Sequence, residues 1–168
     1  MFGQAKMPDR FIDLKLTLED LCYSHSVTYT IQRSIEDEWN RKSTENHSVS
    51  IPIKAGWKTG TKITYEGYGN ETVMRAAGDV IFVVKELPHS LYERKGDDLW
   101  MMAKISLQEA LEGSTVEFVD ILSGSTKKTR FNPLSSSSQT LRLPNFGMPI
   151  LKHPDTRGEL IIRFNVIF

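Results

Sequence analysis

The chain has 168 residues, of which 39% are hydrophobic and 25% charged, an ordinary composition for a globular protein. The 21 basic and 21 acidic residues give a formal net charge of zero. This balance argues against nucleic acid as the main partner, because phosphate binding usually needs a clustered basic surface. The single cysteine, Cys22, excludes an internal disulfide and a multi-cysteine zinc site, and it fits a reducing, intracellular setting.

Alternation of apolar and polar residues predicts that strands dominate the chain. The alternating segments lie at residues 12–18, 26–32, 48–53 and 160–168. Pro52 cannot donate to a sheet ladder, so its strand is expected at a sheet edge. Residues 80–84 are apolar on both parities and are expected to be covered on both faces, whereas the polar segment 34–47 is expected to form a mobile loop.

Two short helices are predicted, one in each half of the chain. Thr17 precedes Asp20 by three positions, and Ser106 precedes Glu109 in the same way, which is the arrangement of a capping box. Each helix is expected to last only one or two turns, and the second should end at Gly113.

An internal repeat is the most informative feature of the sequence. Three blocks recur in the same order: 15–18 matches 104–107, 63–69 matches 141–147, and 78–81 matches 158–161. The repeat predicts an all-β chain of two tandem sandwich-like domains with one short helix each. Residues 1–10 are expected to be a linker or an extension introduced by cloning, followed by a first domain at 11–93 and a second at 94–168.

No catalytic or metal-binding pattern stands out. The four histidines, at 25, 47, 89 and 153, lack metal spacing, and no glycine-rich phosphate loop is present. Cys22 has no base beside it in the sequence and is predicted to be a packed side chain. We therefore expect a protein that is not an enzyme, with no catalytic residues, no cofactor and no metal.

Duplicated sheets with polar loops suit the binding of an extended polypeptide. A sheet edge offers unpaired N–H and C=O groups, and an apolar groove beside it accepts alternate side chains. The strand that contains Pro52 and the apolar stripe of Ser26–Gln32 are the candidates. By periodicity alone, Tyr29 and Ile31 are better explained as ordinary core residues.

Several segments together resemble the C-terminal domains of the DnaJ (heat-shock-protein-40) family over about residues 11–168. The matching segments are 13–21, 54–65 (KAGWKTGTKITY), 78–84 followed by Pro88-His89, 97–99, 105–111 and 147–161. The resemblance implies β-sandwich-like peptide-binding domains of a type II member, which lacks the zinc module. Such proteins are cytoplasmic stress-response co-chaperones that hold unfolded clients for a DnaK-type seventy-kilodalton heat-shock ATPase, and the full-length forms are homodimers.

The resemblance also implies a site in the first domain. Carried over position by position, the family's peptide groove falls on Ile12, Leu14, Tyr29, Ile31, Tyr65 and Phe82. Two lysines with which the family binds the acidic Glu-Glu-Val-Asp tail of the ATPase fall on Val27 and Asn46. Arg33, Arg41 and Lys42 lie nearby in the sequence as candidate replacements, and Arg33 is the one assigned to the site. An alternative from another class is a structural or assembly scaffold that keeps the fold without chaperone activity.

Overall fold

The computed structural model describes residues 5–168, which form two compact units. Unit 1 contains the residues up to 16, 25–53 and 58–86, and unit 2 contains 17–24, 54–57 and 87–168. The two short segments 17–24 and 54–57 precede residue 93 in sequence and nevertheless belong to unit 2. Of the expected linker, residues 1–4 lie outside the described part of the chain, and Ala5–Lys6 forms a strand.

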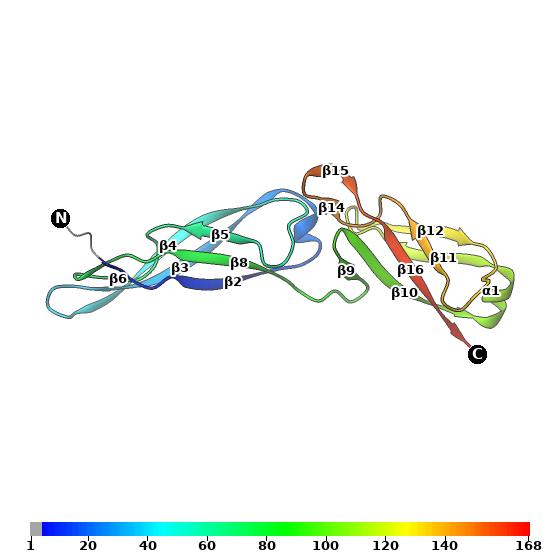
Figure 1. Ribbon diagram of the computed structural model, residues 1–168, viewed down its shortest axis with the longest axis horizontal. Helices are drawn as coiled ribbons and strands as arrows, with labels where there is room; N and C mark the ends of the chain where they lie inside the picture. The colour runs from blue at the N-terminus through cyan, green and yellow to red at the C-terminus, as the bar shows by residue number, and fades with distance from the viewer. Residues whose placement is uncertain (1–4) are drawn as a thin grey trace. The chain divides into compact units, whose positions relative to one another are not determined.

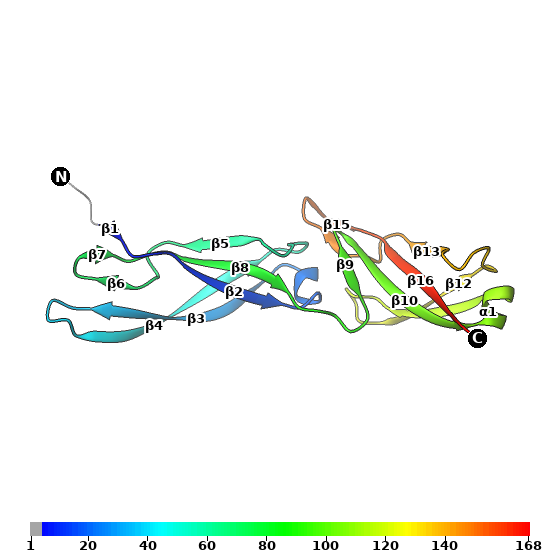
Figure 2. The ribbon, with the colours of Figure 1, turned by 60° about the horizontal axis from the view of Figure 1, so that its bottom comes forward.

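Unit 1 consists of strands, as the alternation predicts. They are β1 (Ala5–Lys6), β2 (Arg10–Leu16), β3 (His25–Glu36), β4 (Lys42–Ile53), β5 (Lys62–Tyr65), β6 (Glu71–Thr72), β7 (Arg75–Ala76) and β8 (Val80–Glu86). One sheet has the order β2-β8-β5, another the order β4-β3-β6, and β1 pairs with β7 (Figures 1 and 2). β4 lies at an edge of its sheet, which confirms the expectation drawn from Pro52.

The core of unit 1 lies between its two three-stranded sheets. β8 is the central strand of its sheet, parallel to β2 and antiparallel to β5. Val80, Phe82 and Val84 have no exposed surface, whereas Ile81 and Val83 on the outer face remain partly exposed. The expectation that both faces of this strand are covered is therefore wrong, because an apolar run does not reveal whether a second layer packs outside the sheet.

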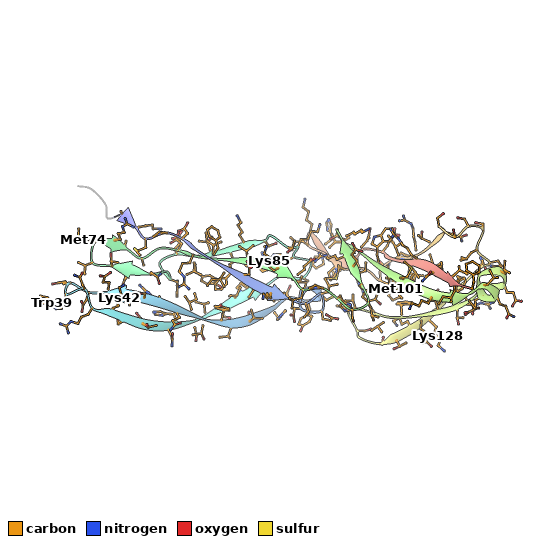
Figure 3. The ribbon with its side chains drawn as sticks, turned by 90° about the horizontal axis from the view of Figure 1, so that it is seen from below. Trp39, Lys42, Met74, Lys85, Met101 and Lys128 are labelled. Atoms are coloured by element: carbon orange, nitrogen blue, oxygen red, sulfur yellow. The ribbon has the colours of Figure 1, made fainter. Side chains whose placement is uncertain are left out.

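The β3–β4 hairpin is longer than the sequence indicates. The segment 34–47, expected as a mobile loop, is strand at both ends, and only residues 37–41 make the turn. Glu36 lies directly opposite Lys42, and such a pair of opposite charges favours strand pairing. Trp39 lies in the turn and is 69% exposed (Figure 3). Sequence failed here because residues that are polar on both faces carry no periodic signal.

Unit 2 contains the helical segments of the described chain, 5–168. Its elements are η1 (Asp20–Cys22, a 3₁₀ helix), β9 (Glu93–Lys95), β10 (Asp98–Ser106), α1 (Leu107–Glu112), β11 (Ser114–Val119), β12 (Thr126–Phe131), β13 (Thr140–Leu143), β14 (Pro149–Ile150), β15 (His153–Arg157) and β16 (Leu160–Ile167). The main sheet has the order β13-β16-β10-β9, and β11-β12 and β14-β15 form pairs. Abundant strand in both units confirms the all-β prediction.

Both predicted capping boxes form. The Ser106 hydroxyl accepts a hydrogen bond from the Glu109 N–H at 3.1 Å, and the Glu109 carboxylate accepts one from the Ser106 N–H at 2.9 Å. α1 then ends at Gly113, whose φ of 80° favours glycine. Thr17 and Asp20 make the same reciprocal pair at 3.1 and 3.0 Å, but only the 3₁₀ turn η1 follows.

The sequence repeat is also a repeat of topology. In unit 1, β8 lies between β2 and β5, and in unit 2, β16 lies between β10 and β13 in the same directions. The registers correspond as well, since Leu14 pairs with Val84 and the equivalent Ala103 pairs with Phe164. The two units are therefore copies of one fold, as the repeat predicts.

Glycines at matching positions explain one of the repeated blocks. The Gly69 N–H donates to the Gly78 carbonyl at 2.9 Å, and the Gly147 N–H donates to the Gly158 carbonyl at 2.8 Å. A Cβ on Gly69 would lie 2.8 Å from the Gly78 oxygen, and one on Gly147 would lie 2.6 Å from the Gly158 carbonyl carbon. Each copy therefore needs glycine here for close backbone approach.

Candidate functional site

The most distinctive feature of unit 1 is a strand edge without a partner. On one side, β3 pairs with β4 along its whole length, from His25 to Glu36. On the other side, β6 pairs with β3 only at Ile35 and Glu36. Within residues 5–168, the part of β3 before Ile35 therefore has no strand on this second side, which we call the free edge of β3.

Two side-chain contacts show which backbone groups face the free edge. Arg10 Nη1 donates to the Gln32 carbonyl at 2.7 Å, and the Ser34 N–H donates to Asn70 Oδ1 at 2.8 Å. Neither bond belongs to the β3–β4 ladder, and the direction of backbone groups alternates along a strand. The even-numbered residues of β3 therefore point their N–H and C=O groups away from β4, and those of Ser26, Thr28 and Thr30 face the free edge without a partner among the described residues.

Strand β2 lies beside this edge. The Arg10 side chain on β2 bonds the Gln32 carbonyl on β3, and Ile12 follows Arg10 on the same face of β2. Ile12 and Tyr29 are both half-buried, so each leaves apolar surface accessible near the free edge. Tyr29 packs edge-on against Phe82 with the ring centroids 5.1 Å apart. Packing of this kind holds the phenol ring in one orientation.

Tyr65 extends the aromatic cluster away from the free edge. Its ring meets Phe82 at a centroid distance of 5.6 Å, and its hydroxyl donates to the Ser50 carbonyl on β4 at 2.9 Å. Burial raises the pKa of Tyr65, and the neighbouring Tyr68 raises it further, so the hydroxyl remains a donor. Tyr65 therefore ties β5 to β4 and is half-buried, with Phe82 between it and Tyr29.

The predicted groove residues divide into accessible and buried sets. Ile12, Tyr29 and Tyr65 keep exposed surface, whereas Ile31 and Phe82 have none and Leu14 is 7% exposed. A side chain without exposed surface cannot touch a bound peptide in this conformation. The buried three form the core below the site, because their alternation points them between the sheets.

Arg33 does not lie where an acidic ligand could reach it. Its side chain is 11% exposed, and Nη2 lies 3.2 Å from Glu71 Oε1 on β6. The distance is that of an ion pair, although Nε and Nη2 make no hydrogen bond of good geometry. The odd-numbered position directs the side chain inward, so the structure contradicts an exposed role for this charge.

Arg10 is the cation that the sequence analysis missed. It lies on β2 and contacts the free edge of β3 through the Gln32 carbonyl, with no carboxylate partner among residues 5–168. The available signal was its parity, because Arg10 precedes Ile12, Leu14 and Leu16 in one alternating series. Assigning residues 1–10 to a linker concealed that signal.

Cys22 is packed, as expected. It is buried, and its Sγ lies 3.2 Å from the Leu18 carbonyl oxygen and 3.9 Å from Met148 Sδ. Burial raises the pKa of this thiol to about 12. Among residues 5–168, no group of three or more His, Cys, Asp or Glu side chains could hold a metal ion, and no helix of that stretch is long and apolar enough to cross a membrane.

A free strand edge with half-exposed aromatic and aliphatic side chains beside it is the construction of a polypeptide-binding sheet module. The chain belongs to the family described as DnaJ C terminal domain, whose sequence pattern it matches over residues 11–168. The resemblance stated from the sequence motifs is thereby confirmed.

Known relatives agree with this assignment. The chain is 35% identical to Protein psi1 of Schizosaccharomyces pombe over 155 residues, which cover 92% of this chain and 41% of that protein. It is 34% identical to DnaJ homolog subfamily B member 5 of Homo sapiens over 157 residues, or 93% and 45% of the two chains. It is also 34% identical to Chaperone protein DnaJ 2 of Aquifex aeolicus over 120 residues, or 71% and 31%. The chain thus spans less than half of these relatives.

Proposed function

We propose that unit 1 binds extended segments of unfolded polypeptide along the free edge of β3, as the client-binding part of a co-chaperone. The observation that carries the proposal is the row of unpaired backbone groups at Ser26, Thr28 and Thr30. Every polypeptide carries complementary N–H and C=O groups, so pairing of this kind accepts clients of any sequence. The short strand β6 supports the idea, because it already pairs with the last residues of the same edge.

Side-chain contacts would supply selectivity. Ile12 and Tyr29 offer partly exposed apolar surface next to the edge, and an alternate client side chain could cover it. Burial of apolar surface contributes roughly 25 cal/mol per Å² before ordering costs. Clients with aliphatic or aromatic residues at every second position should therefore bind best.

Suppression of client aggregation tests the proposal. Tyr29→Ala should reduce the ability of the chain to keep a chemically denatured protein from scattering light, because it removes apolar surface at the edge. Phe11→Ala is the matched control, since Phe11 is an exposed aromatic residue on β2 that points to the outer face. Equal loss in both variants, or in neither, would argue against the edge.

We further propose that the same edge can receive the acidic C-terminal tail of a seventy-kilodalton heat-shock ATPase. Arg10 is the cation best placed for it, because it sits at the edge with its charge unmatched by a carboxylate in residues 5–168. Calorimetry with a short peptide ending in Glu-Glu-Val-Asp measures this binding directly. Absence of heat at high peptide concentration would limit the site to clients.

The scaffold alternative makes the opposite prediction for clients. A protein that keeps the fold only for assembly would neither suppress aggregation nor bind unfolded peptide. Val27 and Asn46 replace basic residues of the family, and their lack of charge is an argument against binding of the acidic tail. The same two substitutions leave the backbone groups that would pair with a client unchanged. The aggregation assay therefore separates the two functions.

A further inference from the structure

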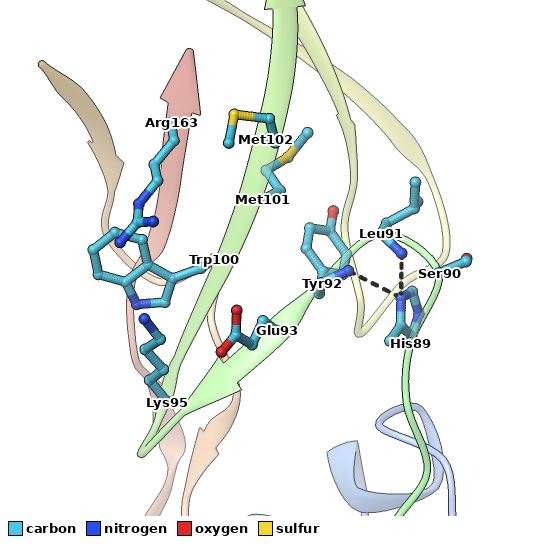
Figure 4. Close-up of a pocket in the computed structure, with 10 residues that line it drawn as sticks. All are labelled: His89, Ser90, Leu91, Tyr92, Glu93, Lys95, Trp100, Met101, Met102 and Arg163. Atoms are coloured by element: carbon cyan, nitrogen blue, oxygen red, sulfur yellow. Dashed lines mark hydrogen bonds between the residues drawn. The ribbon is translucent and has the colours of Figure 1, made fainter. Parts of the chain in front are cut away.

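The outer face of the main sheet of unit 2 carries a hollow that the proposed function does not use. The hollow has a volume of about 280 Å³ and lies over β9, β10 and β16 (Figure 4). Its walls include Leu91, Tyr92, Lys95, Trp100, Met102 and Arg163. Trp100, Met102 and Arg163 also line a second hollow of about 440 Å³, so the concave surface continues across the sheet.

Two cations converge on one indole ring in this hollow. Lys95 Nζ lies 4.7 Å from the centroid of Trp100, and Arg163 Cζ lies 4.4 Å from it (Figure 4). The ring attracts each cation, and the two like charges repel one another. The indole ring lies between the two cations, and both cationic side chains are exposed, so each remains accessible to an anion (Figure 4).

The charges around the hollow are predominantly positive. Glu93 is the carboxylate of its lining, against Lys95 and Arg163. Lys104 lies two positions beyond Met102 on the same outward face of β10. His89 also lines the hollow, but both of its ring nitrogens are already engaged, because Nδ1 accepts from the Leu91 N–H at 3.0 Å and Nε2 lies 2.6 Å from Glu19 Oε1. The face is therefore complementary to an acidic ligand.

A free backbone edge runs alongside the hollow. β9 pairs with β10 only from Asp98 to Trp100, so β10 has no strand on that side from Met101 onward within the described residues. The Leu99 N–H donates to the Glu159 carbonyl on the opposite side. By alternation, the N–H and C=O groups of Met102 and Lys104 point toward the free side.

We propose that this surface of unit 2 binds an extended acidic polypeptide segment. The segment continues the line of β9 and pairs with the backbone of Met102 and Lys104. Its carboxylates approach the exposed Lys95 and Arg163, where charge-assisted hydrogen bonds are available. An apolar side chain of the segment covers Met102 and Leu91, which are 56% and 51% exposed.

An extended polypeptide fits this surface better than an isolated anion. The unpaired N–H and C=O groups of β10 can bond the main chain of a peptide, and the exposed Met102 and Leu91 can be covered by an apolar side chain of that peptide. The site lies wholly in unit 2, whereas the free edge of β3 lies in unit 1. The proposal therefore does not rest on client binding by unit 1, and either can fail alone.

Peptide binding to the whole chain tests the proposal. The probe is a short fluorescein-labelled peptide that alternates glutamate with leucine, and its counterpart has lysine in place of glutamate. Anisotropy in low and physiological salt gives both dissociation constants. Neutralising the two cations in Lys95→Gln/Arg163→Gln should weaken the acidic peptide about tenfold, as expected for loss of charge-assisted contacts.

A matched control neutralises one lysine and one arginine elsewhere in unit 2. Lys127 and Arg130 are exposed on β12, in a different sheet, so Lys127→Gln/Arg130→Gln tests the effect of net charge alone. This control should change the affinity by less than about twofold. Hydrogen exchange should show that the peptide protects the amides of Met102 and Lys104.

Four results would overturn the proposal. Equal weakening by both double variants would mean that only net charge attracts the peptide. Equal affinity for the lysine peptide would remove the acidic specificity. Absence of added protection in β10 would rule out strand pairing there. Loss of self-association in Lys95→Gln/Arg163→Gln, with unchanged peptide affinity, would assign the face to a second copy of the chain and refute the peptide site.

Discussion

Replacing Thr28 with proline should weaken polypeptide binding and leave the fold of unit 1 nearly unchanged. The Thr28 N–H faces the free edge of β3 and makes no bond in the β3–β4 ladder, so its loss removes no structural hydrogen bond. Proline deletes that donor and places its ring where the incoming chain would lie. The variant therefore separates binding from stability.

The magnitude follows from one lost main-chain bond. A net contribution of about 1 kcal/mol corresponds to roughly a fivefold change in dissociation constant. The ring also excludes the partner backbone, so the total weakening should reach at least about tenfold. The free energy of unfolding should fall by less than about 1 kcal/mol, because an edge position with an unbonded N–H tolerates proline.

The natural sequence supplies a precedent for the control. Pro52 occupies β4 opposite Ser26, a pair whose backbone groups point away from each other. Ser48→Pro places proline at the equivalent outward position of β4, opposite Thr30, on the edge not assigned to the ligand. Fluorescence anisotropy with an unfolded client peptide and urea denaturation give the two quantities. Unchanged affinity in Thr28→Pro, with the protein folded, would refute pairing along β3.

Three other measurements follow from the structure. Arg10→Glu should weaken an acidic tail peptide at least about tenfold in calorimetry and a neutral client far less, and equal losses would contradict an electrostatic role. Burial by itself raises the pKa of Asp120, but hydrogen bonds, chiefly from Arg157 at 2.7 Å, outweigh it and leave the pKa below its usual value. Asp120→Asn should therefore lower the free energy of unfolding, measured by urea denaturation at neutral pH, by about 2 kcal/mol. This difference from wild type should persist at every pH above the pKa of about 3.9 that the carboxyl has in the unfolded chain, and it should shrink as pH falls through the lower pKa of the folded chain. Burial raises the pKa of the Cys22 thiol to about 12. At pH about 8 a thiol reagent should therefore label Cys22 about a hundredfold more slowly in the native chain than in the unfolded chain. Fast labelling of the native chain would contradict the burial of Cys22.

Local patterns were sufficient wherever the information was local. The capping box at Ser106 and Glu109 and the stop at Gly113 are correct because each depends on residues within one turn. The repeat predicted two copies of one topology because matched side chains need matched surroundings. Pro52 marked an edge strand because the missing N–H is a property of that residue alone.

Predictions based on one segment failed where a second segment decides the outcome. The polar stretch 34–47 became a hairpin because its two ends pair with each other. Ile81 and Val83 remain partly exposed because no periodicity states whether another layer covers a sheet. Sequence also placed residues 17–24 with the first domain, whereas their contacts belong to unit 2.

The candidate site shows the same division between sequence and structure. Alternation indicated that Tyr29 and Ile31 are both core residues, which is correct for Ile31, whereas Tyr29 is only half-buried. The sequence by itself determined the strands, the repeat and the family. Only the tertiary structure decided that β6 stops short and leaves β3 open, and that Arg33 is matched by Glu71 while Arg10 reaches the edge. Those outcomes depend on pairing between residues distant in the chain, and the period of a strand records its inner and outer faces but not its neighbours.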